Sequence, residues 1–81
     1  MQKIRADMNI GENMRRLRKL YGFKQDELVA KIELLGLTIS RSTYSRYETG
    51  ELNVPVSVLV ALHMIYGCKY DDFFMGLDIV T

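Results

Sequence analysis

The sequence contains one cysteine, one proline, one histidine and no tryptophan among its 81 residues. Cys68 alone cannot form a disulfide within the chain, which favours a reducing compartment. No apolar run reaches the ~18 residues that a membrane helix needs, and residues 1–9 lack the apolar centre of a signal peptide. We therefore expect a cytoplasmic protein with no membrane partner.

Motifs for catalysis, phosphate binding and metal binding are also missing. His63 has no second histidine, cysteine or carboxylate at ligand spacing, so no metal site is predicted. Serines, His63 and Asp71 do not indicate a catalytic triad, because no glycine-strained nucleophile turn is present. A helical bundle of this length also leaves little room for a substrate cleft. We expect neither an enzyme nor a cofactor.

The charge is unevenly distributed, although the net charge is only +1. Residues 1–50 hold ten Lys and Arg against six Asp and Glu, whereas residues 51–81 hold one against four. A basic half beside an acidic half favours one face turned toward a polyanion. The alternative is a helix face that is basic for solubility alone.

The apolar spacing has the 3.6-residue period of helices, and strand signals are poor. A glycine follows each of the first four predicted helices, as expected of helix ends. The fourth follows Pro55 and is apolar nearly all round, so we expect it to be the buried centre of the domain. The predicted helices span 10–21, 25–35, 40–49 and 56–66, with a short fifth that begins near Asp71.

Two helix starts carry capping signals. Asn9 is predicted to cap the first helix, with Glu12 completing a capping box. Ser40 is predicted to cap the third helix. Ile39 and Tyr44 fit a hydrophobic staple around that cap.

The third predicted helix has an unusual polar face. Tyr44 and Tyr47 fall on its other side, toward the core. An ordinary solvated face carries Glu and Lys, but this face has neither, and its short hydroxyls would allow close approach to a DNA groove. Arginines there could each make two hydrogen bonds to guanine. The polar residues lie within an arc of ~140°: Arg41, Ser42, Ser45, Arg46 and Thr49.

The second and third helices, with a turn of residues 36–39 between them, have the arrangement of a helix-turn-helix. The order and spacing of several sequence segments match those of a known family. They are residues 14–18, 24–28, 39–50 and 71–74, together with Ile10, Pro55, Leu59 and Leu62. Over residues 10–74 the chain resembles the Cro/C1-type (phage-repressor, XRE-like) helix-turn-helix family. The resemblance implies an all-α, five-helix lambda-repressor-like domain over 10–76, a flexible arm over 1–9 and a tail over 77–81.

The resemblance also implies roles for individual residues. Arg41, Ser42 and Arg46 stand at base-reading positions, with Ser45 between them. Apart from the resemblance, Ser40 as the cap leaves the helix start open to a polyanion. Gln25 is expected to meet a phosphate and to brace the recognition helix. The remaining expected backbone contacts are Lys24, Thr49, Gly50 and Asn53.

Two further roles concern the fold and the arm. Arg18 and Glu48 match a buried ion pair that ties the first helix to the third, and a lone carboxylate at that edge of the core would be costly. Lys3 and Arg5 could form an arm over DNA, and an untethered tail is the alternative.

The chain departs from the family pattern in two ways. The segment from Gln25 to Ser40 is roughly five residues longer, which we interpret as one extra turn on the second helix before a turn of ~4 residues. Val29 stands where the family favours a small residue. Both changes could tilt the recognition helix.

The expected function is sequence-specific binding to double-stranded DNA by a homodimer that regulates transcription, with repression as the default. The alternative is an antitoxin- or antirepressor-type module that binds a protein partner through the same fold. The fourth helix, the Phe73–Phe74 pair and the tail residues Leu77, Ile79 and Val80 could supply the dimer or partner surface.

Overall fold

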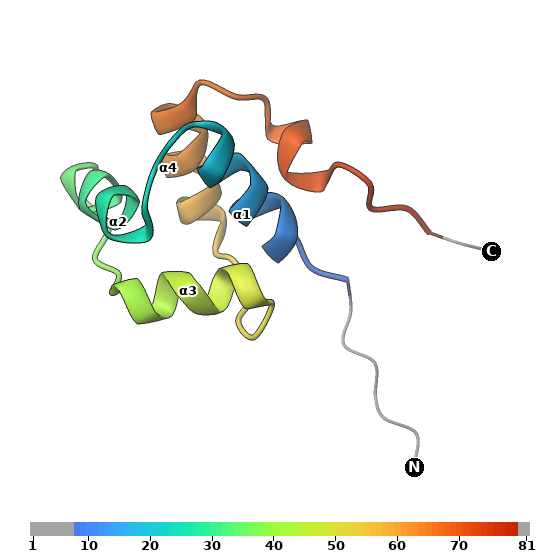
Figure 1. Ribbon diagram of the computed structural model, residues 1–81, viewed down its shortest axis with the longest axis horizontal. Coiled ribbons are helices and arrows are strands. Elements are labelled where there is room, and N and C mark those ends of the chain that lie inside the picture. The colour runs from blue at the N-terminus through green and yellow to red at the C-terminus, as the bar shows by residue number, and fades with distance from the viewer. Residues whose placement is uncertain (1–7, 80–81) are drawn as a thin grey trace, which may run out of the picture.

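The computed structural model describes residues 8–79 (Figure 1). These residues form four α-helices and contain no strand, which confirms the all-α fold class. The fifth predicted helix is instead a 3₁₀ turn of five residues between Lys69 and Met75. The elements are α1 (Gly11–Leu20), α2 (Gln25–Leu34), α3 (Arg41–Thr49), α4 (Val56–Tyr66) and the 3₁₀ turn η1 (Tyr70–Phe74).

Parts of the predicted arm and tail fall outside the described residues. Lys3 and Arg5 lie within residues 1–7, and Val80 lies within residues 80–81. The arm over 1–9 and the tail over 77–81 therefore stay predictions. Within residues 8–79, no helix is long and apolar enough to cross a membrane.

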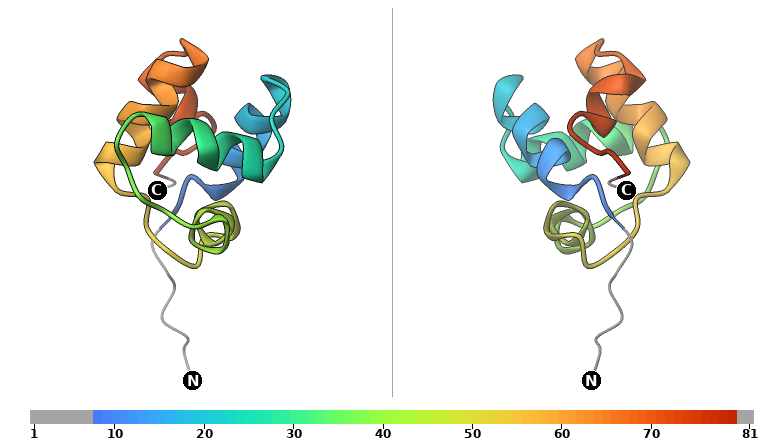
Figure 2. Two further views of the ribbon diagram at one scale, coloured as in Figure 1. Left: turned by 90° about the vertical axis from the view of Figure 1, so that its left-hand side faces the viewer. Right: turned by 90° about the vertical axis from the view of Figure 1, so that its right-hand side faces the viewer.

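Helix α3 lies along one end of the molecule. Figure 1 shows it below the other helices, and in Figure 2 it is seen nearly end-on. It packs against α1 and α2, whereas α4 packs against α2. Because its partners cover α3 from one side, its other side faces solvent.

The core is built by side chains from every element. Helix α4 contributes Val58, Ala61, Leu62 and Tyr66, but Val56 is 74% exposed and Met64 is 61% exposed. The prediction that α4 is the buried centre is therefore wrong for one of its faces, since α2 covers only the other. The largest fully buried side chains are Tyr44, Phe73, Met14, Leu17, Leu28, Ile32, Leu62 and Val58.

The two predicted caps have different outcomes. Ser40 caps α3 as predicted, since its Oγ accepts a hydrogen bond from the Thr43 N–H at 3.1 Å. At α1 the N-cap position is Ile10, which is buried against the core, and Asn9 Oδ1 accepts from the Gly11 N–H at 2.9 Å. The predicted capping box at Asn9 is therefore wrong: Ile10 takes the N-cap position, and no side-chain hydrogen bond caps the helix there.

The connection between α2 and α3 is longer than predicted. Helix α2 ends at Leu34, and residues 35–40 lead to α3. Gly36 has a φ of +98°, a left-handed conformation that ends the helix. Leu37 and Ile39 are partly buried against the core and hold the connection in place. The extra length is therefore not a whole added helical turn before a turn of four residues.

Candidate nucleic-acid interface

Two tyrosines fix α3 to the body of the domain. Tyr44 is fully buried and Tyr47 nearly so, and their ring centroids lie 6.3 Å apart in an edge-to-face arrangement. Burial raises the pKa of the Tyr44 hydroxyl well above its ordinary value, so this side chain stays neutral. A buried aromatic seam of this kind sets the rotation of α3 about its axis.

The opposite face of α3 presents the polar side chains to solvent. The Arg41 side chain is 68% exposed and that of Arg46 is 61% exposed. The Thr49 hydroxyl donates to the Arg46 carbonyl at 3.1 Å, and the Ser40 and Ser42 hydroxyls lie 3.2 Å apart. The face forms a shallow hollow of about 470 Å³, lined by Arg41, Ser42, Ser45, Arg46, Thr49 and Glu51.

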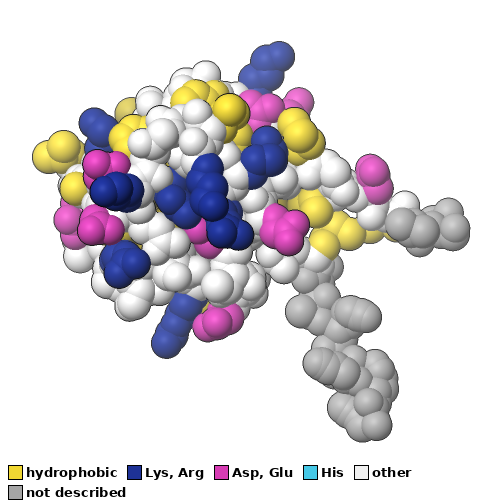
Figure 3. All heavy atoms as spheres, viewed as in Figure 1, with side chains coloured by type: hydrophobic (Ala, Val, Ile, Leu, Met, Phe, Trp, Pro, Cys, Tyr) yellow, Lys and Arg dark blue, Asp and Glu magenta, His cyan; other side chains and the backbone are white. Residues whose placement is uncertain are grey.

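Each of these arginines lies beside a carboxylate from outside α3. Arg41 Nε is 3.5 Å from Asp26 Oδ1 in the first turn of α2. Arg46 Nε is 3.7 Å from Glu51 Oε1 in the loop after α3. Figure 3 shows basic and acidic side chains next to one another along its lower edge, over α3. The polar face is thus flanked by negative charge at two points.

Beneath the polar face, Arg18 and Glu48 form a buried ion pair between α1 and α3. Their side chains are 10% and 5% exposed, and Arg18 Nε lies 2.6 Å from Glu48 Oε2. A second bond joins Arg18 Nη2 to Glu48 Oε1 at 3.1 Å, and Arg18 Nη1 donates to the Phe23 carbonyl at 2.9 Å. The pair ties the end of α3 to α1 and to the segment before α2.

The protonation state of Glu48 follows from its surroundings. Burial alone would raise the pKa of this carboxyl, but hydrogen bonds from Arg18 and Gln25 outweigh it and lower the pKa below its ordinary value. The same contact with Glu48 raises the pKa of Arg18. Both groups are therefore charged at neutral pH.

The start of α2 is joined to the same cluster. Gln25 Nε2 donates to Glu48 Oε1 at 3.0 Å, so Gln25 braces α3 directly. Lys24, the residue before it, is exposed, and its N–H donates to Glu27 Oε1 at 2.9 Å. Asn53 lies in the loop after α3 and lines a different hollow, shared with Asn9 and with Tyr47 of α3. The structure thus places the expected contact residues on α3, at the start of α2 and in the loop after α3.

Gly11 is a positioning residue that sequence reasoning missed. A Cβ added to Gly11 would lie 2.8 Å from the Tyr47 carbonyl oxygen and nearer still to that of Glu48. Both atoms belong to the backbone of α3, so α1 and α3 meet here at closer range than any side chain allows. A glycine in the first turn of a helix, with no chain turn after it, was the available signal.

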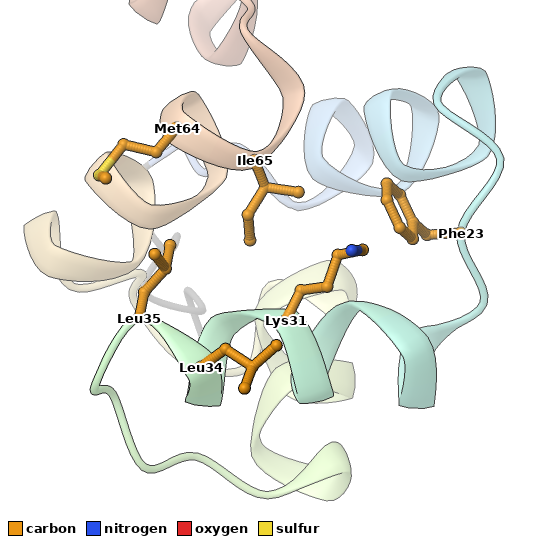
Figure 4. A pocket seen from close by; sticks show the side chains of 6 residues that line it. All are labelled: Phe23, Lys31, Leu34, Leu35, Met64 and Ile65. Carbon is orange, nitrogen blue, oxygen red and sulfur yellow. The ribbon is translucent and has the colours of Figure 1, made fainter.

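A second hollow lies between α2 and α4 and shares no residue with the hollow over α3. Its volume is about 380 Å³, and Figure 4 shows Ile65 and Lys31 pointing into it from α4 and α2. The Lys31 ammonium lies 5.8 Å from the Phe23 ring centroid. The lining is otherwise apolar: Phe23, Leu34, Leu35, Met64 and Ile65.

His63 and Cys68 are engaged within the fold. His63 Nδ1 lies 2.6 Å from the Cys68 carbonyl oxygen, and the His63 ring stacks on Tyr70 at 4.2 Å. Cys68 is buried, which raises the pKa of its thiol. Among residues 8–79, no group of three or more His, Cys, Asp and Glu could hold a metal ion.

Comparison with known proteins gives a family match over most of the chain. A family model described as helix-turn-helix matches residues 14–73, a stretch that contains α2, the connection and α3. Searches of curated proteins and of solved structures gave no match. The chain therefore belongs to the Cro/C1-type (XRE) helix-turn-helix family of DNA-binding proteins.

Proposed function

We propose that this protein regulates transcription by binding a specific sequence in duplex DNA, with α3 in the major groove. The observation that carries the proposal is the solvent-exposed face of α3, on which Arg41 and Arg46 stand among short hydroxyls. The buried tyrosines behind this face hold it in one orientation. Rigid presentation of this kind favours reading of base edges over loose attraction to phosphate.

The proposed contacts divide into base reading and positioning. Arg41 and Arg46 read guanine through paired hydrogen bonds, while Ser42 and Ser45 reach a base edge or a phosphate. Gln25 keeps one amide N–H for a phosphate after its bond to Glu48. The other positioning contacts are Lys24, Ser40, Thr49, Gly50 and Asn53.

Arg41→Ala and Arg46→Ala are expected to lower affinity for a duplex selected from random DNA by about 5- to 150-fold each. A bidentate contact to guanine contributes roughly 1–3 kcal/mol. Affinity for a scrambled duplex should fall much less. Fluorescence anisotropy with both duplexes, across a salt series, measures the two effects separately.

Lys31→Ala is the matched control, because it removes one positive charge beside the apolar hollow and away from α3. Its preference for the selected duplex should equal that of the wild type. Failure of the wild type to bind any selected duplex at low salt would contradict the proposed function.

We further propose that the active form is a homodimer on a near-palindromic operator, with half-sites about one helical turn (~34 Å) apart. Exposed apolar side chains support it, among them Val56, Met64, Phe74 and Ile79. Bound at a promoter, the dimer would exclude polymerase and so repress transcription. Light scattering at micromolar concentration should give twice the 9.4 kDa chain mass. A strictly monomeric mass would contradict the dimer.

A second candidate function is that of an antitoxin- or antirepressor-type module whose main partner is a protein. The apolar hollow between α2 and α4 favours it, since nothing in the described residues covers Leu34 or Met64. A module that binds only protein would select no duplex from random DNA. The same selection experiment therefore separates the two functions.

A further inference from the structure

The two carboxylates beside the α3 arginines occupy comparable positions. Asp26 comes from the first turn of α2 and Glu51 from the loop after α3, yet each lies next to the Nε of one arginine, at 3.5 Å and 3.7 Å. All of these side chains are largely exposed. Exposed ion pairs of this kind contribute little to folding, so their effect should appear in binding.

The geometry at Nε leaves the arginines able to read a base. A guanidinium has five N–H donors in a planar fork. A carboxylate beside Nε leaves N–H groups at the far end of the fork, which are the groups that pair with guanine O6 and N7. Asp26 and Glu51 can thus keep their contacts while Arg41 and Arg46 bind a base.

The same carboxylates would weaken a contact between either arginine and a phosphate. A phosphate that approached either arginine would also approach a second negative charge, and like charges at short range repel. A guanine edge carries only the partial negative charges of O6 and N7, so it meets a much smaller penalty. The surroundings of each arginine therefore discriminate between the two kinds of DNA contact.

We propose that Asp26 and Glu51 are specificity-determining residues that position Arg41 and Arg46 for bases and keep them off the phosphate backbone. The inference rests on the proposed function, because it concerns how the same face distinguishes its operator from other DNA. Their contribution is selectivity, achieved by weakening binding to unmatched sequences.

The test uses Asp26→Asn, Glu51→Gln and the double variant, with affinities measured for the selected and the scrambled duplex across a salt series. Each single change should tighten binding to the scrambled duplex by about threefold. The double change should reduce the preference for the selected duplex by roughly tenfold. Thermal unfolding should change little, since these pairs are exposed and Asp26 adds only the modest helix-dipole effect of a first-turn carboxylate.

Asp71→Asn is the matched control, because it removes the same charge from an exposed residue of η1, which packs against α1. Any general effect of net charge will appear in this control and can be subtracted. A double variant that keeps the wild-type preference, or changes its logarithm by no more than twice the change in Asp71→Asn, would overturn this inference alone. Failure of the wild type to prefer any duplex would overturn both this inference and the proposed function.

Discussion

Glu48→Ala is expected to lower the free energy of unfolding by about 3–5 kcal/mol, because it leaves the buried Arg18 guanidinium without its counter-charge. Arg18 would keep only its bond to the Phe23 carbonyl, and Gln25 would lose its acceptor. Small domains have only about 5–15 kcal/mol of stability in total. The change should appear in urea titration as a lower midpoint.

The wild type should also lose this stabilisation in acid. The pKa of Glu48 is lower in the folded protein than its ordinary value of 4.5. The contribution is therefore complete above pH 4.5 and is lost as the pH falls through the lowered folded value. The difference in stability between the wild type and Glu48→Ala should shrink over that range.

Glu51→Ala is the control for stability, since Glu51 is exposed and its removal should change the free energy of unfolding by less than about 0.5 kcal/mol. A double change of Arg18→Met with Glu48→Leu should cost less than Glu48→Ala, because no buried charge remains. A loss of under about 1 kcal/mol in Glu48→Ala would show that the pair does not hold α3 in place.

Gly11→Ala is expected to lower the free energy of unfolding by about 3 kcal/mol, at the upper end of ordinary overpacking. Helix propensity alone gives the opposite sign, since alanine is favoured over glycine by about 0.5–1 kcal/mol in a helix interior and by less at a first helical residue such as Gly11. The cost arises because the added Cβ meets carbonyl groups of Tyr47 and Glu48, which are backbone and cannot rotate away. Urea titration gives both the sign and the size.

Glu12→Ala provides the comparison in the same helical turn, because Glu12 is exposed. Its effect on stability should stay within about 0.5 kcal/mol. If Gly11→Ala proves as stable as the wild type, or more stable, then α1 and α3 can move apart with no loss of free energy of unfolding, which would contradict this prediction.

The helices could be predicted from the sequence because their boundaries are local. Gly50 and Gly67 adopt φ values of +83° and +71° at the ends of α3 and α4, as expected of glycines that end helices. The bounds of α4 and the Ser40 cap agree with the structure for the same reason. The errors lie where tertiary packing matters: the residue before α1, Ile10, is buried in the core, and the exposed face of α4 depends on what covers it.

The features of the candidate site also fall into those that the sequence predicts and those that depend on packing. The polar arc of α3 follows from helical periodicity, so Arg41, Ser45 and Arg46 could be grouped from sequence. The contacts of Gly11 and Asp26 with α3 could not be, because each joins two elements whose crossing depends on the whole core. Side chains at such crossings acquire their role only from tertiary structure.

The most direct test of the central claim, that the exposed face of α3 reads DNA, is NMR of the isotope-labelled protein as a selected duplex is added. The amide signals that change most should belong to residues 24–26 and 40–51, with the signals of residues 60–65 nearly unmoved. Changes confined to residues 31–35 and 60–65, around the apolar hollow between α2 and α4, with α3 unaffected, would contradict the claim.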